Sequence, residues 1–544
     1  MKLVKAPTVI HDTIRLDRAA SPEEVGIRTS AVTAFVQKIE ELSYRYHSLM
    51  IIRHGVVAAE VHRYPFSVDT PHIMYSVSKS VTSCAVGFAV EEGFLDLDTR
   101  ISDVFPEYLP KDAEECEKFS RITVKHLLTM TSGKAPSVLA DKTKGDWIRQ
   151  FVDAKWYGEP GVDFRYINEN IFMLCAMVQR RTGMSVIDFL TPRLFEPLGI
   201  EPPYWETDEW GVESGGWGLF LTPESFAKFT LTYHNRGVFN GKQVIPRHWV
   251  EESTKTQAET GETGPVGSPG YGYCFWINSD NIYRAAGVFG QIGVSLQKED
   301  LCLVATGGQV HYEEVLAAFY DFAETVTDEP LCADESELLY MKEYLSSRVI
   351  DNIPVSTDEE TVKDLIDDKV ILFRNPIIAN MAGFSPSVLN TASVYMTKDR
   401  AGGMNRFSFR FFDDFALFQW TEGDEICCVR LGLDGAYRAS KVTLAGTSYT
   451  IYGAAAWTDP NTLEVWIRPV ESIGKKIFTF SFKGKRVTLS TYSEPEIDAM
   501  ITDTVDSFFA KIKSDKGKNV ANKLYRYMRD FAQPVMHGEL IEKR

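Results

Sequence analysis

Long apolar runs are absent from this sequence of 544 residues, and so are the common cysteine motifs. No stretch of roughly 18 apolar residues occurs, so no transmembrane helix is predicted. The eight cysteines form no C-x-x-C pair and no Cys/His cluster with metal-ligand spacing, and no N-x-[ST] sequon is present. We therefore expect buried free thiols in a reducing compartment, no bound metal and no membrane partner.

Basic residues are scarce relative to acidic ones. Lys plus Arg total 58 and Asp plus Glu total 75, which gives a formal net charge of −17. Such a surface repels phosphate backbones, so nucleic acid is not expected as a partner. The N-terminus has no apolar stretch long enough for a signal peptide, which favours a cytoplasmic location. The chain is 44% hydrophobic and 24% charged, as is typical of packed globular proteins.

The patterns along the chain predict four parts. Residues 1–330 mix helices, strands and loops, whereas residues 331–369 are acidic and turn-rich and suit a linker with short helices. Residues 370–495 alternate apolar and polar positions, as in F-S-F-R-F-F and I-F-T-F-S-F, which predicts an antiparallel sheet or small barrel, possibly of the lipocalin type. Residues 496–544 predict a helical tail.

Several elements of the first part have recognisable ends. Ser21 is a predicted N-cap, with Glu24 completing a capping box, for a helix that runs to about Leu42. A hairpin is predicted over residues 47–63 around a turn at His54-Gly55. Further helices are predicted over 81–90, 122–130, 170–182 and 223–235, and strands over 272–277, 293–297 and 301–306.

The segment Ser76-Val77-Ser78-Lys79 is an S-x-x-K pattern, which is weak alone because it recurs at Ser225, Ser295 and Ser472. Ser76 differs because it follows an extended segment and opens a strongly apolar helix. Residues three apart share a helix face, so Lys79 can reach the Ser76 hydroxyl. A lysine in an apolar setting can act as a base near neutral pH. The alternative is a serine N-cap beside a solvated lysine.

The segment Tyr166-Ile167-Asn168 is the second candidate. It follows P-G-V-D-F-R and precedes a predicted buried helix. Tyr166 can shuttle a proton between a nucleophile and a leaving group, and Asn168 can hold Lys79 and a substrate carbonyl. The Tyr-x-Asn pattern recurs at Tyr233, and a buried turn tyrosine is the alternative interpretation.

The two motifs, in this order and about 90 residues apart, resemble those of the serine beta-lactamase-related family. That family includes class C beta-lactamases, DD-peptidases of the penicillin-binding type, D-aminopeptidases, esterases and 6-aminohexanoate-dimer hydrolase. The resemblance covers about residues 18–328. Other segments that carry it are S-P-E-E-V-G-I, E-E-G-F-L-D-L-D-T-R-I-S-D-V-F-P-E-Y, I-T-V-K-H-L-L-T-M-T-S-G, L-F-E-P-L-G-I, G-G-W-G-L-F-L-T-P, G-V-F-N-G-K-Q-V-I-P and A-A-G-V-F-G-Q.

The resemblance implies an α+β fold and a set of roles. An antiparallel sheet flanked by helices, together with a helical subdomain, would form the first domain and hold the site between them. Ser76 would be the acylated nucleophile and Lys79 its base. Tyr166 would be the second acid/base group, and Asn168 would orient them.

The third motif of the family, Lys-Thr-Gly or His-x-Gly, falls at Ala285-Ala286-Gly287, where only the glycine is kept. The backbone N–H groups of Ser76 and Val288 would then form the oxyanion hole. The alanines offer no cation or hydroxyl to a substrate carboxylate, which weighs against beta-lactams and peptidoglycan stems as substrates. Gln291 is a candidate polar group in the pocket. Its alternative is a side chain bonded to the backbone at a strand end.

We therefore expect a serine hydrolase that cleaves a small ester or amide through a Ser76 acyl-enzyme, without a cofactor. A small-molecule substrate is the expected partner, and the oligomeric state is left open. One alternative is an acylating binding or sensor protein with little turnover. Others are a D-amino-acid peptidase or beta-lactamase, and a structural module with an inactive site.

Overall fold

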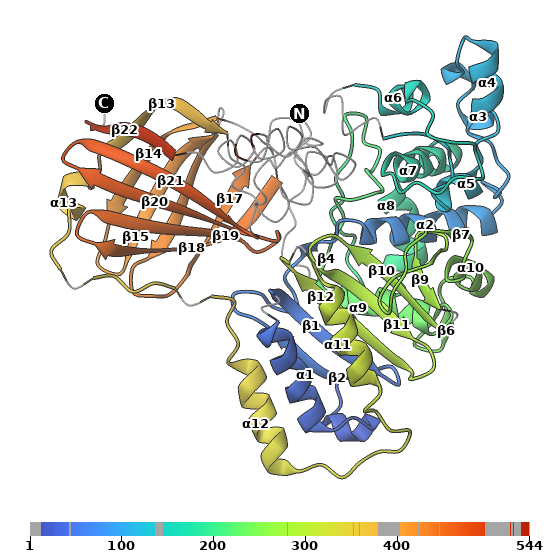
Figure 1. Ribbon diagram of the computed structural model, residues 1–544, viewed down its shortest axis with the longest axis horizontal. Coiled ribbons are helices and arrows are strands. Elements are labelled where there is room, and N and C mark those ends of the chain that lie inside the picture. The colour runs from blue at the N-terminus through green and yellow to red at the C-terminus, as the bar shows by residue number, and fades with distance from the viewer. Residues whose placement is uncertain are drawn as a thin grey trace. The chain divides into compact units, whose positions relative to one another are not determined.

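The computed structural model of the protein divides into two compact units, Val9–Ile350 and Asp351–Arg544 (Figure 1). Within the described residues, no helix is both long and apolar enough to cross a membrane. The structure describes residues 12–42, 45–136, 145–279, 281–309, 311–351, 353–357, 359–378, 403–422, 425–444, 447–495, 523, 526 and 535–542.

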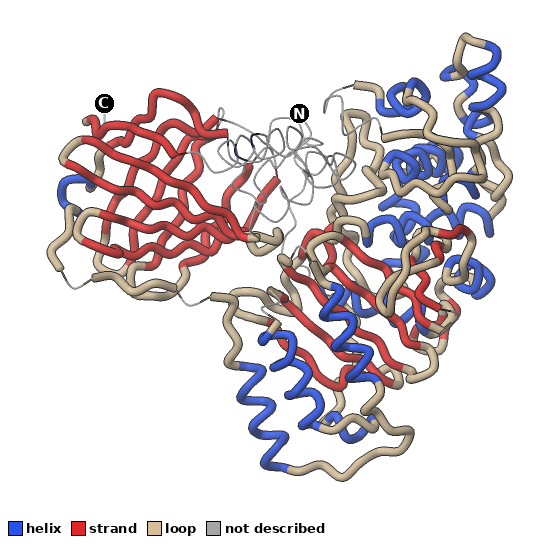
Figure 2. Tube along the Cα trace, in the orientation of Figure 1, coloured by secondary structure: helices blue, strands red, loops and turns tan. Residues whose placement is uncertain are grey.

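The first unit is built on an eight-stranded antiparallel sheet in the order β2-β1-β12-β11-β10-β9-β8-β7 (Figure 2). Every residue of β1 and β12 is buried, because helices cover both faces of the sheet. The strands are β1 (Tyr46–Arg53), β2 (Val56–His62), β7 (Ala258–Glu259), β8 (Gly270–Tyr271), β9 (Trp276–Ser279), β10 (Ile282–Gly287), β11 (Gln291–Leu296) and β12 (Leu301–Gly307). Short pairs lie outside it: β3 (His72–Ile73) with β4 (Phe220–Leu221), and β5 (Val238–Phe239) with β6 (Lys242–Gln243).

One face of the sheet is covered by α1 (Thr29–Glu41), α11 (Glu313–Ala323) and α12 (Glu335–Ser346) (Figure 1). On α1, apolar residues recur at helical spacing, which gives the helix one buried stripe. Val32, Phe35, Val36 and Ile39 form this stripe and pack into the core. Met341 and Leu345 of α12 join the same core, so this helix belongs to the first unit.

The other face is covered by α2 (Val77–Glu91) and α9 (Pro223–His234), which pack against β10, β11 and β12. A helical subdomain packs around α2. Its helices are α3 (Ile101–Val104), α4 (Ala113–Phe119), α5 (Val124–Leu128), α6 (Trp147–Asp153), α7 (Glu169–Thr182) and α8 (Val186–Leu190), and α10 (Arg247–Ser253) also packs on α2. The shorter turns are η1 (Pro22–Val25), η2 (Pro106–Tyr108) and η3 (Thr191–Phe195).

The predicted hairpin over residues 47–63 is confirmed as β1 and β2, with His54 and Gly55 both at positive φ in the turn. The predicted helices over residues 81–90 and 170–182 are found as parts of α2 and α7. Gly93 follows the C-cap residue of α2 and Gly183 is the C-cap residue of α7, and both adopt the positive φ that is typical of glycines at helix ends. These signals succeed because they depend on local backbone geometry alone.

The prediction of one helix from Ser21 to Leu42 is wrong. A short 3₁₀ turn, η1, ends at Gly26, whose φ is 71°, and α1 begins only at Thr29. A Cβ on Gly26 would collide with the carbonyl oxygen of Thr327. The Ser21 side chain makes no capping hydrogen bond, and Glu23 instead accepts from the Thr29 amide at 2.6 Å. A distant segment therefore determines where this helix starts.

The prediction of a strand over residues 272–277 is also wrong. Strand β8 ends at Tyr271 and β9 begins at Trp276, with a tight turn between them. In that turn the Gly272 amide donates to the Phe275 carbonyl, and Cys274 has φ of 67°. Aromatic residues are favourable in strands, but here the aromatic-rich segment forms the turn that connects β8 to β9.

The second unit is a closed antiparallel β-barrel. Its ten strands run in the order β16-β15-β14-β13-β22-β21-β20-β19-β18-β17, and a bridge between Gly432 and Ala454 joins β16 to β18 and closes a ring of nine. The bounds are β13 (Val370–Ile378), β14 (Gly403–Phe411), β15 (Phe415–Glu422), β16 (Glu425–Gly432), β17 (Arg438–Leu444), β18 (Thr447–Asp459), β19 (Thr462–Pro469), β20 (Lys475–Lys483), β21 (Arg486–Glu494) and β22 (Val535–Ile541). One short helix, α13 (Lys363–Ile366), packs against β14.

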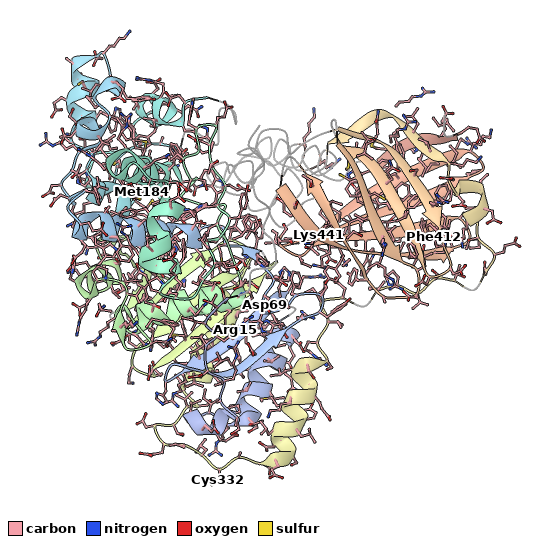
Figure 3. All side chains as sticks on the ribbon, turned by 180° about the vertical axis from the view of Figure 1, so that it is seen from behind. Arg15, Asp69, Met184, Cys332, Phe412 and Lys441 are labelled. Atoms are coloured by element: carbon pink, nitrogen blue, oxygen red, sulfur yellow. The ribbon has the colours of Figure 1, made fainter. Side chains whose placement is uncertain are left out.

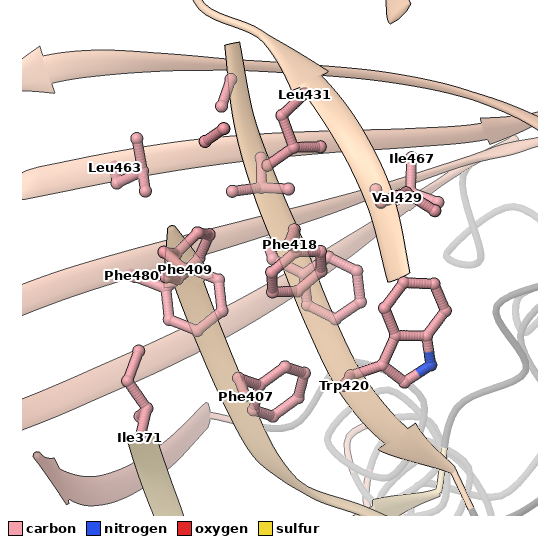
Figure 4. Close-up of a cluster of buried hydrophobic side chains, with 14 of the residues drawn as sticks. Ile371, Phe407, Phe409, Phe418, Trp420, Val429, Leu431, Leu463, Ile467 and Phe480 are labelled. Atoms are coloured by element: carbon pink, nitrogen blue, oxygen red, sulfur yellow. The ribbon is translucent and has the colours of Figure 1, made fainter. Parts of the chain in front are cut away.

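The barrel interior is filled by aromatic side chains (Figure 4). Phe407 and Phe409 alternate with outward residues on β14, as the period-two pattern predicts. Phe407 stacks on Phe418 at 5.8 Å, and Phe409 meets Phe480 edge-on at 5.3 Å. These rings occupy the space that a ligand would need in an open barrel.

The predicted helical tail over residues 496–544 needs a correction at its end. Residues Val535–Ile541 form β22, which pairs with both β13 and β21 and completes the barrel wall. The alternating pattern in this segment is too short to predict a strand. Its pairing with β13 and β21 shows that it is one. The rest of the predicted helical tail, residues 496–534, lies almost entirely outside the described residues.

All eight cysteines are free thiols, but not all are buried. Cys84, Cys175, Cys274, Cys302 and Cys427 are buried as expected. Cys332, between α11 and α12, is exposed (Figure 3). Cys428, on β16, is also exposed. The expectation of buried thiols is therefore wrong for these two.

Candidate active site

Ser76 stands at the N-terminus of α2. It occupies the N-cap position, with φ −70° and ψ −9°, and its side chain is half-buried. Residues Val77 to Ala89 of α2 are buried. The free N–H groups and positive dipole end of this helix point at the serine, which favours negative charge there.

Lys79 lies one helical turn after Ser76 and is 1% exposed. Its Nζ lies 2.9 Å from Ser76 Oγ, 2.7 Å from Asn168 Oδ1 and 2.7 Å from the Gly216 carbonyl oxygen. All three partners are neutral. Among the described residues, no carboxylate lies within salt-bridge distance of this ammonium group. Burial lowers the pKa of Lys79 to about 7, so its neutral form is accessible near neutral pH.

The Tyr166 ring lies beside the Lys79 amine. It lies 4.8 Å from Lys79 Nζ and stacks on Trp276 at 5.3 Å, while Tyr271 meets it edge-on at 6.0 Å. Burial raises the pKa of Tyr166 well above its usual range, although the Ser76 hydroxyl opposes the shift. The phenol therefore holds its proton at neutral pH.

Gly287 brings the end of β10 against the serine. A Cβ on Gly287 would collide with the Met74 carbonyl oxygen and would lie 3.2 Å from the Ser76 nitrogen. Only a glycine allows this approach. The next residue is Val288, so two backbone segments far apart in sequence meet where the oxyanion hole was expected.

Comparison with known protein families identifies the family of this chain. A family model described as Beta-lactamase matches residues 30–318, which is more than half of the chain. The chain belongs to the Beta-lactamase family.

The curated relatives of this Beta-lactamase family member are distant. The 6-aminohexanoate-dimer hydrolase of Paenarthrobacter ureafaciens is 23% identical over 294 residues, 49% of this chain and 74% of that protein. Penicillin-binding protein 4 of Amycolatopsis lactamdurans is 37% identical over 130 residues, 23% of this chain and 33% of that protein. The D-aminopeptidase of Brucella anthropi is 25% identical over 185 residues, 32% of this chain and 35% of that protein.

Two solved structures are similar to this family member in fold. A putative 6-aminohexanoate-dimer hydrolase from Bacillus anthracis is 19% identical, with a TM-score of 0.48 over 60% of this chain and 91% of that one. An octameric penicillin-binding protein homologue from Pyrococcus abyssi is 16% identical, with a TM-score of 0.43 over 85% of this chain and 97% of that one.

The interpretation of Gln291 as a pocket residue needs correction. Its side chain is fully buried, and its Nε2 donates to the Val288 and Gly307 carbonyl oxygens at 3.2 and 3.0 Å. Its Oε1 accepts from the Gly307 amide at 3.1 Å. Because the amide group is taken up by the backbone, Gln291 fastens the β10–β11 turn to β12 and is not available to a substrate.

The other three S-x-x-K serines are buried in ordinary packing. Ser225 and Ser295 are 1% and 0% exposed, and Ser472 is 7% exposed. Ser225 donates to Asp12 at 2.9 Å, and the lysine that follows it, Lys228, pairs with the same carboxylate at 3.3 Å. Each of these motifs lacks the combination of an accessible hydroxyl and an amine bound only by neutral oxygens.

Sequence reasoning missed two features of the site. The Gly216 carbonyl is the third ligand of the Lys79 amine, and a Cβ there would lie 3.1 Å from Asn168 Oδ1. The G-G-W-G segment carries the family resemblance, but its sequence does not indicate this contact. Trp276, the first residue of β9, stacks on Tyr166, and the strand pattern does not indicate which side chain its ring contacts.

Within the described residues, no group of three or more His, Cys, Asp or Glu side chains is arranged to hold a metal ion. The groups gathered at the site are a hydroxyl, an amine, a phenol and an amide, which are suited to proton transfer and nucleophilic attack.

Proposed function

We propose that this chain is a serine hydrolase that cleaves a small ester or amide through an acyl-enzyme on Ser76. One observation carries the proposal. The Lys79 amine, with a pKa of about 7, lies 2.9 Å from a half-buried serine hydroxyl at a helix N-terminus. A nucleophile within hydrogen-bond reach of a base of matched pKa is the arrangement that acyl transfer needs.

The proposed acylation step moves one proton around the site. Neutral Lys79 accepts the Ser76 proton as Oγ bonds to the substrate carbonyl carbon. The negative charge that develops on the carbonyl oxygen is held by the N–H groups of Ser76 and Val288. Tyr166 gives its proton to the leaving alkoxide or amine and regains one from the Lys79 ammonium. The acyl group then remains on Ser76, and the alcohol or amine departs.

Deacylation repeats the sequence with water. Water loses a proton to the Tyr166–Lys79 pair as its oxygen bonds to the acyl carbon. The bond to Ser76 Oγ then breaks, and the proton returns to the serine. Asn168 and Gly216 keep the Lys79 amine beside the hydroxyl throughout both steps.

The substrate is proposed to be neutral near the reacting bond. Ala285 and Ala286 are 3% and 6% exposed and replace the cation or hydroxyl that the family motif has at these positions. Relatives of this chain are named as a dimer hydrolase and a D-aminopeptidase, and one solved structure of similar fold is a carboxylesterase. These names support hydrolysis of both esters and amides as candidates.

The test is a panel of para-nitrophenyl esters, D-amino acid amides and nitrocefin, assayed with wild type, Ser76→Ala and Ser472→Ala. We expect turnover of at least one ester or amide, a loss of at least about 10³-fold in Ser76→Ala, and no change in Ser472→Ala. A fluorophosphonate should label Ser76 alone. An adduct mapped to Ser225, Ser295 or Ser472 would refute the nucleophile. A stoichiometric burst without further turnover would identify an acylating binding protein.

A further inference from the structure

Two buried aromatic residues with left-handed backbone flank the proposed oxyanion hole. Tyr75 has φ of 46° and directly precedes Ser76, whereas Phe289 has φ of 68° and directly follows Val288. Their side chains are 4% and 0% exposed. Residues with a Cβ adopt this conformation only where the surrounding structure holds them there, and such residues concentrate at functional sites.

The two aromatic rings are in contact. Their centroids lie 5.3 Å apart with the planes at 61°, which is the favourable edge-to-face arrangement. Tyr75 belongs to the segment that leads into α2, and Phe289 belongs to the turn between β10 and β11. The ring contact therefore joins the two backbone segments that would supply the two oxyanion donors.

Two further features fix the same pair of segments. Gly287 lies against the backbone of Met74 and Ser76, with no room for a side chain between them. Gln291 donates to the Val288 carbonyl oxygen at 3.2 Å and ties that turn to β12. The Val288 side of the hole is therefore anchored to the sheet, and the Tyr75–Phe289 contact connects that anchor to the Ser76 side.

We propose that Tyr75 and Phe289 are positioning residues whose ring contact sets the separation of the Ser76 and Val288 N–H groups. This inference rests on the proposed function. Oxyanion donors act only when both lie within hydrogen-bond distance of the atom that becomes charged. Because these two donors come from separate segments, a rigid link between the segments determines whether both reach one oxygen. The strain in both residues is consistent with a link that the local sequence alone would not form.

The experiment compares Tyr75→Leu, Phe289→Leu and the double variant with wild type on the best ester of the panel. We expect each single variant to lower kcat by about 10- to 100-fold with KM changed by less than about threefold. The double variant should lose about as much as one single variant, because either change already breaks the contact. Tyr75→Phe keeps the ring and should retain kcat within about twofold.

A second measurement separates positioning from general loss of stability. Phenylboronic acid forms a tetrahedral adduct on the nucleophile whose oxygen occupies the hole, so its inhibition constant should rise with the loss of kcat. Phe35→Leu is the matched control, because Phe35 contacts Phe322 at 5.2 Å in the core on the other face of the sheet. It should lower the Tm without changing kcat or boronate inhibition.

The outcomes distinguish this inference from the proposed function. If Ser76→Ala keeps wild-type activity, the proposed function fails and the positioning role fails with it. If Ser76→Ala is inactive while both leucine variants keep kcat and boronate affinity, only the positioning role is overturned. A fall of kcat in Phe35→Leu equal to that in the leucine variants would also overturn it. Should Phe289→Leu fail to fold, Tyr75→Leu and the volume-conserving Phe289→Met decide between these results.

Discussion

Lys79 in the first unit and Lys475 in the barrel are a matched pair with opposite surroundings. Each lies three residues after a serine, and they are 1% and 2% exposed. Lys475 lies 3.3 Å from Asp351 and 3.5 Å from Glu494, in a cluster that also contains Arg468. The hydrogen-bond partners that the structure gives Lys79 are a hydroxyl, an amide oxygen and a backbone carbonyl, all of them neutral.

Both lysines are buried, so burial alone does not distinguish a structural lysine from a catalytic one. The groups that contact the amine make the difference. Burial lowers the pKa of both amines, but the two carboxylates beside Lys475 oppose the shift and favour a charged ion pair. Among the described residues, Lys79 has no carboxylate within salt-bridge distance. The charge of Glu169 opposes the shift only weakly, and the pKa of Lys79 falls to about 7. A buried amine that can lose its proton is costly for folding and useful for catalysis.

The largest effect is expected from Lys79→Met. It removes the proposed base and should lower kcat by about 10²- to 10⁴-fold, with a smaller change in KM. The measurement is steady-state kinetics on the best substrate of the panel. A variant that changed only KM would show that Lys79 binds substrate and does not transfer the proton.

The same variant should also change the pH dependence of stability. The pKa of Lys79 is about 7 in the folded protein, whereas an ordinary lysine, as in the unfolded chain, has a pKa of 10.5. Between these two pH values, the unfolded chain therefore binds more protons than the folded protein. Wild-type stability should therefore rise with pH from about 7 to about 10, and Lys79→Met should lose this rise. Thermal unfolding of both proteins across that range is the measurement. An identical pH dependence would contradict the low pKa.

The converse is expected from Lys475→Met. It removes one of the two cations beside Asp351 and Glu494, leaving Arg468, and should destabilise the barrel by up to about 3 kcal/mol. Esterase kinetics of the folded protein should stay as in wild type. Denaturant unfolding and kcat are measured on the same sample. If Lys475→Met lowered kcat as much as Lys79→Met, the structural role of Lys475 would be refuted.

The fourth prediction concerns the pH–rate profile. Lys79 must be neutral to accept the serine proton, so kcat/KM should fall about tenfold for each pH unit below about 7. Tyr166, with its raised pKa, should stay protonated across this range. Lys475→Met should keep the same profile. A profile that is flat between pH 5 and 7 would exclude Lys79 as the titrating base.

The smallest effect is expected for substrate choice. In the barrel, Lys475 and Arg468 pair with carboxylates. On β10, beside the proposed site, Ala285 and Ala286 stand where the family motif has a cation or hydroxyl. Neutral esters or amides should exceed nitrocefin by about tenfold or more in kcat/KM, because a charged hydrogen bond contributes about 1.5–3 kcal/mol. Ala285→Lys should narrow this gap, with Ala285→Met as the uncharged control. If nitrocefin is hydrolysed as well as the best ester, another residue must bind the carboxylate. Arg165, which directly precedes Tyr166, would be the first residue to substitute.

Much of the site could be predicted because its signals are local. The S-x-x-K spacing places Lys79 one helical turn from Ser76 and so within reach of its hydroxyl. In the structure, the amine and the hydroxyl oxygen are 2.9 Å apart. Tyr166 and Asn168 were found by their pattern and their order in the chain. Period-two alternation predicted the barrel strands and the inward side of Phe407 and Phe409.

The sequence by itself determined which groups are available for chemistry, the hairpin over residues 47–63 and the alternation of inward and outward residues on the barrel strands. Only the tertiary structure decided that Gly216 completes the lysine site, that Gln291 serves the backbone, and that β22 completes the barrel. It also decided that one S-x-x-K pattern has a titratable amine while another has a salt bridge. The physical reason is that burial and partners come from segments distant in sequence, which local spacing does not encode.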